Sequence, residues 1–571
     1  MTITGDHPIS FESATPIPDY AAVKSPVDPE FVDGALRPAN GPISIYHISN
    51  LGMAAHLAGV GVVFGTITGV IYSVLNNYLH MSTTLVATAT ALVTFPRALR
   101  IFTGMLTDRV PLFGYRRRPY MVIGWLLSFV SCLLMAALPL GEPYYRDHAI
   151  SKIQVDQLTP EQKLLINLDA PNHGIRLIIL MMIANVGIVM AYSGFNGILV
   201  DVSQREPEHL RGTAMGDCTI VHYVFGVISS FMTGIGLNSV DYGGSFSWTL
   251  GFNAVMWICA AASLLTIPFS IWCIQEPKVT SVPEKSVFVF LYELLEKRHI
   301  YRFVAFNFFY NVFSTVSVTA SSAIQSDWAG VEPLNSGIAN MATALLTVVG
   351  SWYAKKHGLG WNWRYVVMAC QVGVVVIDVW PTFLTIWDVF RNQWMWLGVP
   401  LLEKAPTAMI GFITGLFVFE LMECQGYEET LMGLGVTTNQ VGQPFATVLT
   451  KTIDGYFDVE RTFIKQDTHR VRAQVTYTYV VMYAINLVSL AFIVFLPRQK
   501  AELREMERSG RKNRVLGTLT LTYLCFSLAW TLMTNILSLS PSTKCLRIAG
   551  GSGCSIQRNF HIFEMPSCEI V

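Results

Sequence analysis

Two arginines lie within an otherwise apolar stretch, and their spacing places them on one helix face with a glycine and an aspartate. The four residues are Arg97, Arg100, Gly104 and Asp108, at intervals of three, four and four. Residues three or four apart share a face of an α-helix. A charge in the membrane costs about 2.5–3.5 kcal/mol on insertion scales, so such a side chain usually faces a cavity. We expect Arg97 and Arg100 to bind an anionic group through paired hydrogen bonds, and an ion pair with another helix is the alternative.

The segment that follows is rich in arginine and reads GMLTDRVPLFGYRRRP from Gly104 to Pro119. A glycine in a membrane helix allows a second helix to approach closely. An aspartate at the membrane edge can pair with an arginine or with the N-terminus of a helix. Because such a pair can form in one conformation and break in another, we expect a conformational switch here. Its expected members are Gly104, Asp108, Arg116, Arg117 and Arg118; the alternative for the three arginines is an anchor that only fixes topology.

Amide side chains interrupt two further apolar stretches. Asn307 and Asn311 are four residues apart within a segment rich in phenylalanine, where a flat heterocycle could stack on the rings and bond to the amides. Asn439 and Gln443 are also four apart and more polar than contact with lipid requires. We expect these four residues to bind substrate, and hydrogen bonds between packed helices are the alternative.

The elements that must position these residues are membrane-spanning helices. The chain of 571 residues is 52% hydrophobic and 14% charged, with a mean hydropathy of +0.43, whereas soluble proteins carry about 25% charged residues. A spanning helix needs about 20 mostly apolar residues. We expect twelve spans, near 51–75, 83–107, 119–140, 175–200, 213–237, 248–273, 303–324, 337–353, 365–385, 395–422, 430–450 and 474–496. A thirteenth uncharged run, 515–539, could span the membrane or pack as an interfacial helix.

Basic residues predict the orientation, because they concentrate on the cytoplasmic side of a membrane. With the N-terminus inside, 23 of the 39 basic residues fall in inner segments and ten in outer loops. The expected fold is an all-α polytopic bundle of two six-helix halves. Its expected parts are a disordered cytoplasmic tail (1–50), an N-terminal half (51–273), a cytoplasmic linker with an amphipathic helix (274–302), a C-terminal half (303–496), a basic cytoplasmic segment (497–514), and an extra apolar helix with a cysteine-containing tail (515–571). If the thirteenth run spans, Cys545, Cys554 and Cys568 face outward and can form a disulfide; otherwise they are thiols.

The arginine-rich segment resembles the Gly-x-x-x-Asp-Arg…Gly-Arg-Arg loop of the major facilitator superfamily. Four residues, 110–113, intervene before Gly114, and this longer form resembles the folate–biopterin transporter family. Segments 96–100, 201–206 and 426–431 fit that family more loosely, and the resemblance runs from about 45 to 500. It implies a major-facilitator bundle, a pteridine-type solute and a role for Asp201 in the switch. Gly197 stands where the family often has a second acid, so proton coupling through an acid pair does not carry over.

These observations predict a secondary transporter that moves a folate/pteridine-type or other anionic solute across the lipid bilayer by alternating access. A proton could serve as the coupling ion, and the plasma membrane is expected over an organelle membrane. A non-transporting receptor or sensor on the same fold and a transporter of another metabolite class are the alternatives. We expect no enzyme activity, cofactor or metal ion, because the chain has no glycine-rich phosphate loop, His-Glu-x-x-His motif or zinc-type cysteine spacing. Zero formal net charge gives no sign of a nucleic-acid partner.

Overall fold

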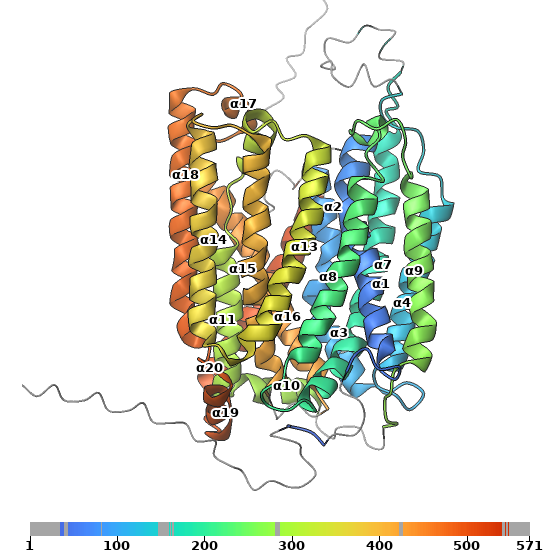
Figure 1. Ribbon diagram of the computed structural model, residues 1–571, viewed down its shortest axis with the longest axis vertical. Helices are drawn as coiled ribbons and strands as arrows, with labels where there is room; N and C mark the ends of the chain where they lie inside the picture. The colour runs from blue at the N-terminus through green and yellow to red at the C-terminus, as the bar shows by residue number, and fades with distance from the viewer. Residues whose placement is uncertain are drawn as a thin grey trace, which may run out of the picture.

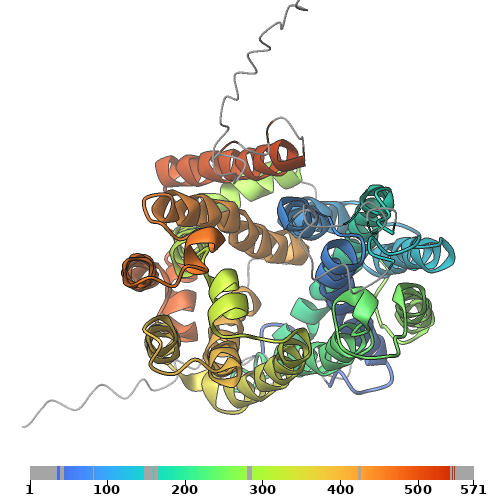
Figure 2. The same cartoon turned by 90° about the horizontal axis from the view of Figure 1, so that it is seen from above.

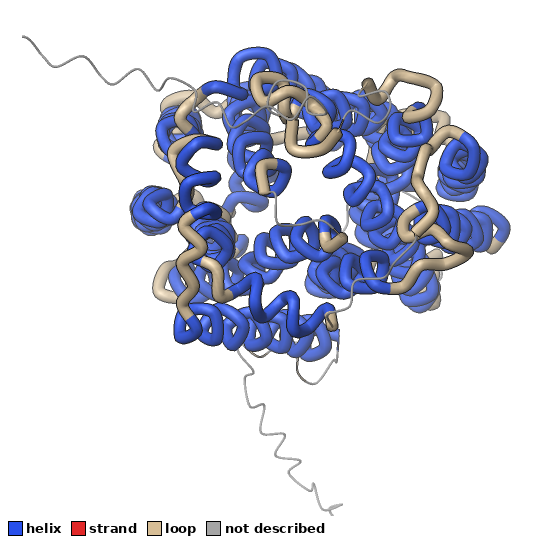
Figure 3. Tube along the Cα trace, turned by 90° about the horizontal axis from the view of Figure 1, so that it is seen from below, coloured by secondary structure: helices blue, strands red, loops and turns tan. Residues whose placement is uncertain are grey.

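Long helices make up nearly all of the regular structure in the computed structural model (Figure 1). The structure describes residues 35–38, 44–81, 83–146, 159, 162, 165–279, 286–421, 426–539, 543 and 546. Within these residues it contains isolated β-bridges but no β-strand, and Figure 3 shows the same helical trace from below. Most of the expected N-terminal tail, together with Cys545, Cys554 and Cys568, lies outside the described residues.

The first group of helices covers residues 51–272 and is called the N-terminal group. Its helices are α1 (Leu51–Val70), which continues as the π-helical η1 (Ile71–Tyr78), α2 (Thr83–Thr94), the 3₁₀ turn η2 (Phe95–Leu99), α3 (Arg100–Arg109), α4 (Arg118–Ala137), α7 (Ala170–Gln204), α8 (Thr213–Gly234), η4 (Val240–Tyr242) and α9 (Phe252–Trp272). The segment α2–η2–α3 forms one continuous path, and its 3₁₀ turn coincides with Pro96, as expected where proline removes a backbone donor.

The second group covers residues 287–539 and is called the C-terminal group. Its helices are α10 (Val287–Leu295), α11 (Arg298–Ser314), α12 (Ser321–Ala323), η5 (Ile324–Trp328), α13 (Pro333–His357), η6 (Gly358–Gly360), α14 (Trp363–Ile386), α15 (Gln393–Phe419), α16 (Glu428–Asp454), α17 (Arg461–Ile464), α18 (His469–Val488), η8 (Ser489–Phe495), α19 (Lys500–Arg508) and α20 (Arg514–Leu539). Figure 2, viewed from above, separates the blue to green helices of the first group from the yellow-green to red helices of the second.

Ten helical segments among the described residues are long and apolar enough to cross a membrane. They are Leu51–Tyr78, Leu85–Arg109, Arg118–Ala137, Ala170–Gln204, Thr213–Gly234, Phe252–Trp272, Trp363–Ile386, Gln393–Phe419, His469–Phe495 and Arg514–Leu537. The last of these lies in α20, so the thirteenth apolar run is a helix of spanning length. Three expected spans are not among the ten. They correspond to α11, which has 17 residues, and to α13 and α16, which are rich in Thr, Asn and Gly. All three pack inside the bundle, α13 on α8 and α15, and α16 on α3 and α11.

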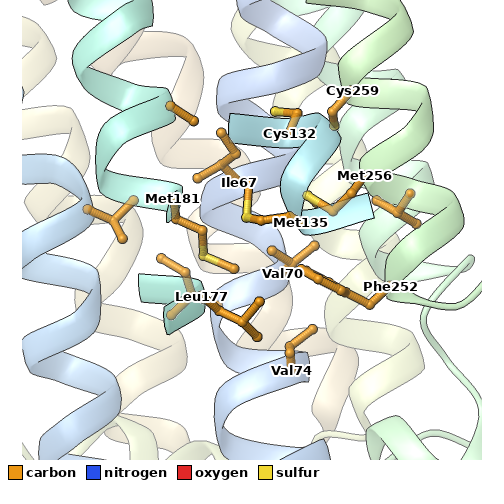
Figure 4. Close-up of a cluster of buried hydrophobic side chains, with 14 of the residues drawn as sticks. Ile67, Val70, Val74, Cys132, Met135, Leu177, Met181, Phe252, Met256 and Cys259 are labelled. Atoms are coloured by element: carbon orange, nitrogen blue, oxygen red, sulfur yellow. The ribbon is translucent and has the colours of Figure 1, made fainter. Parts of the chain in front are cut away.

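Each group has its own apolar core. In the N-terminal group, side chains from α1, η1, α4, α7 and α9 interdigitate (Figure 4). The labelled members are Ile67, Val70, Val74, Cys132, Met135, Leu177, Met181, Phe252, Met256 and Cys259. The main core of the C-terminal group is built around α10, α11, α15 and α16, and it includes Ile101 and Met105 of α3. Because α3 carries these two side chains into the other core, its contact with the C-terminal group is a packed one.

Two glycines allow a close helix contact inside the N-terminal group. A Cβ atom at Gly124 of α4 would lie 2.4 Å from the carbonyl oxygen of Gly187, and one at Gly187 of α7 would lie 2.5 Å from that of Gly124. Such separations leave no room for any side chain, so the two backbones are in direct contact.

Gly124→Ala should therefore separate α4 from α7 and lower the thermal unfolding temperature of the protein in detergent, at a cost of about 1–3 kcal/mol. Gly373→Ala is the matched control, because a Cβ atom at Gly373 of α14 would meet nothing within 4 Å. It should leave the unfolding temperature unchanged or raise it slightly. Equal effects of the two substitutions would contradict the close-packing argument.

Candidate functional site

A cavity of about 950 Å³ lies between the two groups of helices. Its walls come from α1, η2, α3, α7 and α8 on one side and from α13, α15 and α16 on the other. Both arginines selected from the sequence, Arg97 and Arg100, line it. The volume falls within the range of about 300–1,000 Å³ that small-molecule sites occupy.

Arg100 is shared between the cavity and an ion pair with the C-terminal group. Its Nε donates to Oε1 of Glu429 in α16 at 3.1 Å, and its guanidinium carbon lies 4.7 Å from the ring centroid of Tyr192. Its Nη2 is buried without a hydrogen-bond partner. The interhelical ion pair considered from the sequence therefore exists for Arg100, and one of its donors remains unused.

Arg97 has a different environment. Its guanidinium carbon lies 3.9 Å from the ring centroid of Phe64 in α1, a cation–π contact. The structure places no carboxylate among the described residues within ion-pair distance of Arg97. This side chain is a half-buried cation that faces a cavity and has no ion-pair partner among the described residues.

The four amides do not join the arginines. Asn307 is buried in α11. Asn311 packs beside Gly442 of α16, because a Cβ atom added at Gly442 would lie 3.1 Å from Oδ1 of Asn311. Asn439 and Gln443 are exposed on α16. None of the four belongs to the described residues that line the cavity, so their role in substrate binding stays a prediction.

Asp108 connects the two groups at the end of the bundle that carries α10 and α19, which we call the inner end after the expected orientation. The residue is 2% exposed, and its Oδ2 accepts hydrogen bonds from the backbone N of Thr430 at 2.7 Å and from the Oγ1 of Thr430 at 2.8 Å. Thr430 lies in the first turn of α16, where free N–H groups and the helix dipole favour an anion. A Cβ atom at Gly104 would lie 2.6 Å from the carbonyl oxygen of Glu429, so this glycine permits the approach.

Glu428 forms a second bridge next to Asp108. Its Oε1 accepts from Nη2 of Arg37 at 2.6 Å, and its Oε2 accepts from Nη2 of Arg117 at 2.8 Å. Arg37 also pairs with Asp201 at the end of α7, and Asp201 pairs with Arg205. We use the name inner contact for the interactions of Arg37, Asp108, Arg117, Asp201, Glu428 and Thr430. Sequence spacing does not reveal the ion pairs of Arg37 and Glu428, because their partners lie far away along the chain.

The three consecutive arginines have separate surroundings. The carboxylate of Glu276 accepts the backbone N–H groups of Arg116, Arg117 and Arg118 at 2.9, 3.0 and 2.9 Å, and so caps the start of α4. The guanidinium of Arg118 donates to the carbonyl oxygen of Ile271, within the N-terminal group. The side chain of Arg117 reaches the C-terminal group. The part of Arg116 and Arg118 in a switch therefore stays a prediction.

A second ionic cluster at the inner end surrounds Glu420, which follows α15 and is fully buried. Its carboxylate pairs with Arg211 at 2.8 Å, and with Lys500 and Arg504 of α19 at 2.9 Å each. Burial alone would raise the pKa of Glu420, but the three cations outweigh it and hold the pKa below its usual value. Arg504 also pairs with Glu208. Because Arg211 and Glu208 belong to the N-terminal group, α19 ties the two groups together.

The contacts between the groups differ at the two ends of the bundle. α16 packs against α3 and η2 but makes far less contact with α2, which lies nearer the outer end. α8 and α13 pack along most of their length, and Gly234 of α8 lies against Gly337 of α13. The groups are therefore joined by ion pairs at the inner end, whereas beside the outer part of α16 it is α20 that packs against α2.

Comparison with known proteins shows that one segment of the chain is similar to a known family. Residues 60–158 match the BT1 family. The resemblance to folate–biopterin transporters is confirmed over this segment, which contains the arginine-rich loop. None of the curated proteins matches the chain.

Solved structures show the fold of the whole bundle. The major facilitator superfamily proton:xylose symporter XylE, bound to 6-bromo-6-deoxy-D-glucose, aligns with a TM-score of 0.52 at 12% identity over 81% of this chain and 98% of its own. A double tryptophan variant of XylE reaches 0.55 at 12% identity over 81% and 99%. A D-xylose-proton symporter reaches 0.53 at 11% over 78% and 98%. The protein has the major facilitator fold and is an integral multi-pass membrane protein, as expected from its sequence.

Asp108→Asn should weaken the inner contact, because a neutral amide accepts more weakly than a carboxylate at a helix N-terminus. We expect a membrane-impermeant maleimide added to the inner face to label Cys218, which lines the cavity, faster than in the wild type. Thr430→Val is the graded comparison: it removes the hydroxyl donor but keeps the backbone N–H, so its effect should be smaller. Unchanged labelling in Asp108→Asn, at equal protein level, would refute a switch role.

Glu420→Gln should leave three cations without their shared partner, and breaking a buried ion pair in this way costs about 3–5 kcal/mol. Because the pKa of Glu420 is lowered, its stabilisation is complete above the ordinary carboxyl pKa of about 4.3 and is lost as the pH falls through the lowered pKa. Thermal unfolding measured between pH 3 and 7 should show this loss in the wild type and not in Glu420→Gln. Identical pH profiles would mean that Glu420 does not hold the cluster together.

Proposed function

We propose that this protein is a secondary transporter that carries a small organic anion across a membrane by alternating access. The observation that carries the proposal is Arg97, a cation inside the cavity with no ion pair among the described residues. An unpaired charge that is half-buried within the membrane is costly, and an anionic solute would supply the missing partner. The family match and the fold support transport as the activity.

The cavity and the family match together favour a solute that contains a pteridine-type ring. Phe64, Tyr192 and Tyr223 line the cavity around the two arginines, and aromatic side chains provide faces on which a flat heterocycle can stack. The match to the BT1 family adds folates and biopterin as the first solutes to test. The proposal assigns the protein to the plasma membrane.

In this mechanism the cavity receives the anion while the inner contact is closed. The anion pairs with Arg97 and with the unused Nη2 of Arg100. Separation of α3 from the start of α16 then releases Asp108 from Thr430 and opens the inner end. Solute binding can favour this change only if it stabilises the second state more than the first.

A proton is the candidate for a coupling ion. XylE is described as a proton:xylose symporter, and His222 of α8 lines the cavity of this chain together with Arg97. Because the equivalent of the second acid near Asp201 is Gly197, coupling through an acid pair at that point is not part of the proposal.

Uptake by proteoliposomes that contain the purified full-length chain tests the function. Labelled folate, biopterin and a panel of dicarboxylates should be compared, with and without an imposed pH gradient. Accumulation of an anionic solute above the level of empty liposomes is the expected result. Saturable binding without uptake would instead support a receptor or sensor, and uptake of neutral or cationic solutes alone would contradict the assignment to anions.

Arg97→Gln should raise the half-saturation concentration for an anionic solute roughly ten- to hundredfold, since a charge-assisted hydrogen bond contributes about 1.5–3 kcal/mol. Arg97→Lys keeps the charge and should retain part of the affinity. Arg100→Gln should also lower stability, because it leaves Glu429 without its partner. Uptake of uncharged biopterin should change little in Arg97→Gln. An unchanged half-saturation for anions would make Arg97 a structural residue.

A further inference from the structure

The charged residues that line the cavity are all basic. Among the described residues of its wall they are Arg97, Arg100 and Lys404, and the wall contains no Asp or Glu. Glu429 neutralises Arg100. Two positive charges therefore remain in the cavity without an acidic partner in its wall.

Lys404 faces the cavity from the group opposite Arg97. It lies in α15, roughly 16 Å from Gln393 at the start of that helix, while Arg97 lies roughly 20 Å from the outer end of its own span at Leu85. Both side chains are therefore near the middle of a hydrocarbon layer about 30 Å thick. Lys404 belongs to the C-terminal group, so the two cations stand on opposite walls at similar depth.

Nothing among the described residues forms an ion pair with Lys404. The adjacent carboxylate, Glu403, attracts Lys404 electrostatically but forms no ion pair with it and is not part of the cavity wall. Lysine side chains near the ends of membrane helices reach outward to the headgroups, but this lysine is in the middle of α15 and contributes to the wall. The same wall offers polar groups from Asn340 and Thr343 of α13 and from Thr407.

We propose that Lys404 is a second anion-binding residue and that the solute is an organic dianion, with one anionic group near Arg97 and the other near Lys404. The inference rests on the proposed function, which requires only one anionic group. A solute with one negative charge would leave one of the two cations uncompensated once the cavity closes around it, and an unpaired charge is costly away from water. A dianion compensates both and bridges the two groups of helices.

The test measures binding of two probes to the purified full-length protein in lipid nanodiscs. Folate has two carboxylates, and pteroate has the same ring system with one. The wild type should bind folate at least tenfold more tightly than pteroate. Lys404→Gln should weaken folate binding roughly ten- to hundredfold and remove the preference for folate. Lys404→Arg should restore much of it.

Two further variants separate the contributions of the cations. Arg97→Gln should weaken folate binding to a similar degree, and the double variant should lose the sum of the two free energies, because separate groups at distant sites behave additively. Lys356→Gln is the charge-matched control. Lys356 is at the inner end of α13, 5.1 Å from the ring of Trp352, and does not line the cavity, so folate binding should not change.

The outcomes distinguish the two proposals. If the wild type binds folate and Lys404→Gln binds it equally well, the dianion inference is wrong while anion transport stands. Equal affinity of the wild type for folate and pteroate would also contradict the dianion inference and leave anion transport standing. If the wild type binds a dicarboxylate of the uptake panel in place of folate, that dicarboxylate and its monomethyl ester replace the two probes and the same results decide. If no anion binds, the proposed function fails and the dianion inference fails with it.

Discussion

Asp108 accepts two hydrogen bonds from the first turn of α16 at a point where water is almost excluded. This arrangement needs a helix N-terminus with free N–H groups, a carboxylate on the facing helix, and a glycine that lets the two backbones meet. Gly104 supplies the space, and Gly433 does so from the other side, because a Cβ atom there would lie 2.9 Å from the carbonyl oxygen of Arg100. The ion pairs of Glu428 and Glu429 lie beside this junction. If α3 and α16 moved apart, Arg100 would lose Glu429 and Arg117 would lose Glu428.

The local features of this junction could be predicted from the sequence. The spacing of Arg97, Arg100, Gly104 and Asp108 predicted that they lie along one helical segment. The arginine-rich loop predicted an ionic contact. Its partners could not be predicted, because Arg37 and Glu428 are 391 residues apart in the chain, and Glu420 meets α19 only through folding. No local periodicity encodes such pairs. The cysteine-containing tail was predicted from residues that lie outside the described part of the chain.

The amides and the helices that carry them show a second limit of prediction from the sequence. Thr, Asn and Gly lower the hydropathy of α13 and α16, so these helices resemble spans less than their neighbours do, although they pack inside the bundle. Their polar residues fall on several faces, and sequence spacing alone does not say which face meets the cavity. Lys404 illustrates the same point in reverse. Its position in the sequence does not show which way the side chain points, and only the packing of α15 places it in the cavity wall.

The length of α7 has a consequence for the energetics of opening. This helix has 35 residues and is therefore about 52 Å long, well beyond a hydrocarbon layer of about 30 Å. The expected span, 175–200, ends just before Asp201, which places the last turn of α7 in the headgroup region. When the inner contact opens, the carboxylate of Asp201 is rehydrated in this region and does not have to cross hydrocarbon. The thickness of the host bilayer then sets how far this acid stands from the headgroups, which makes hydrophobic mismatch a physical variable in the balance between the two states.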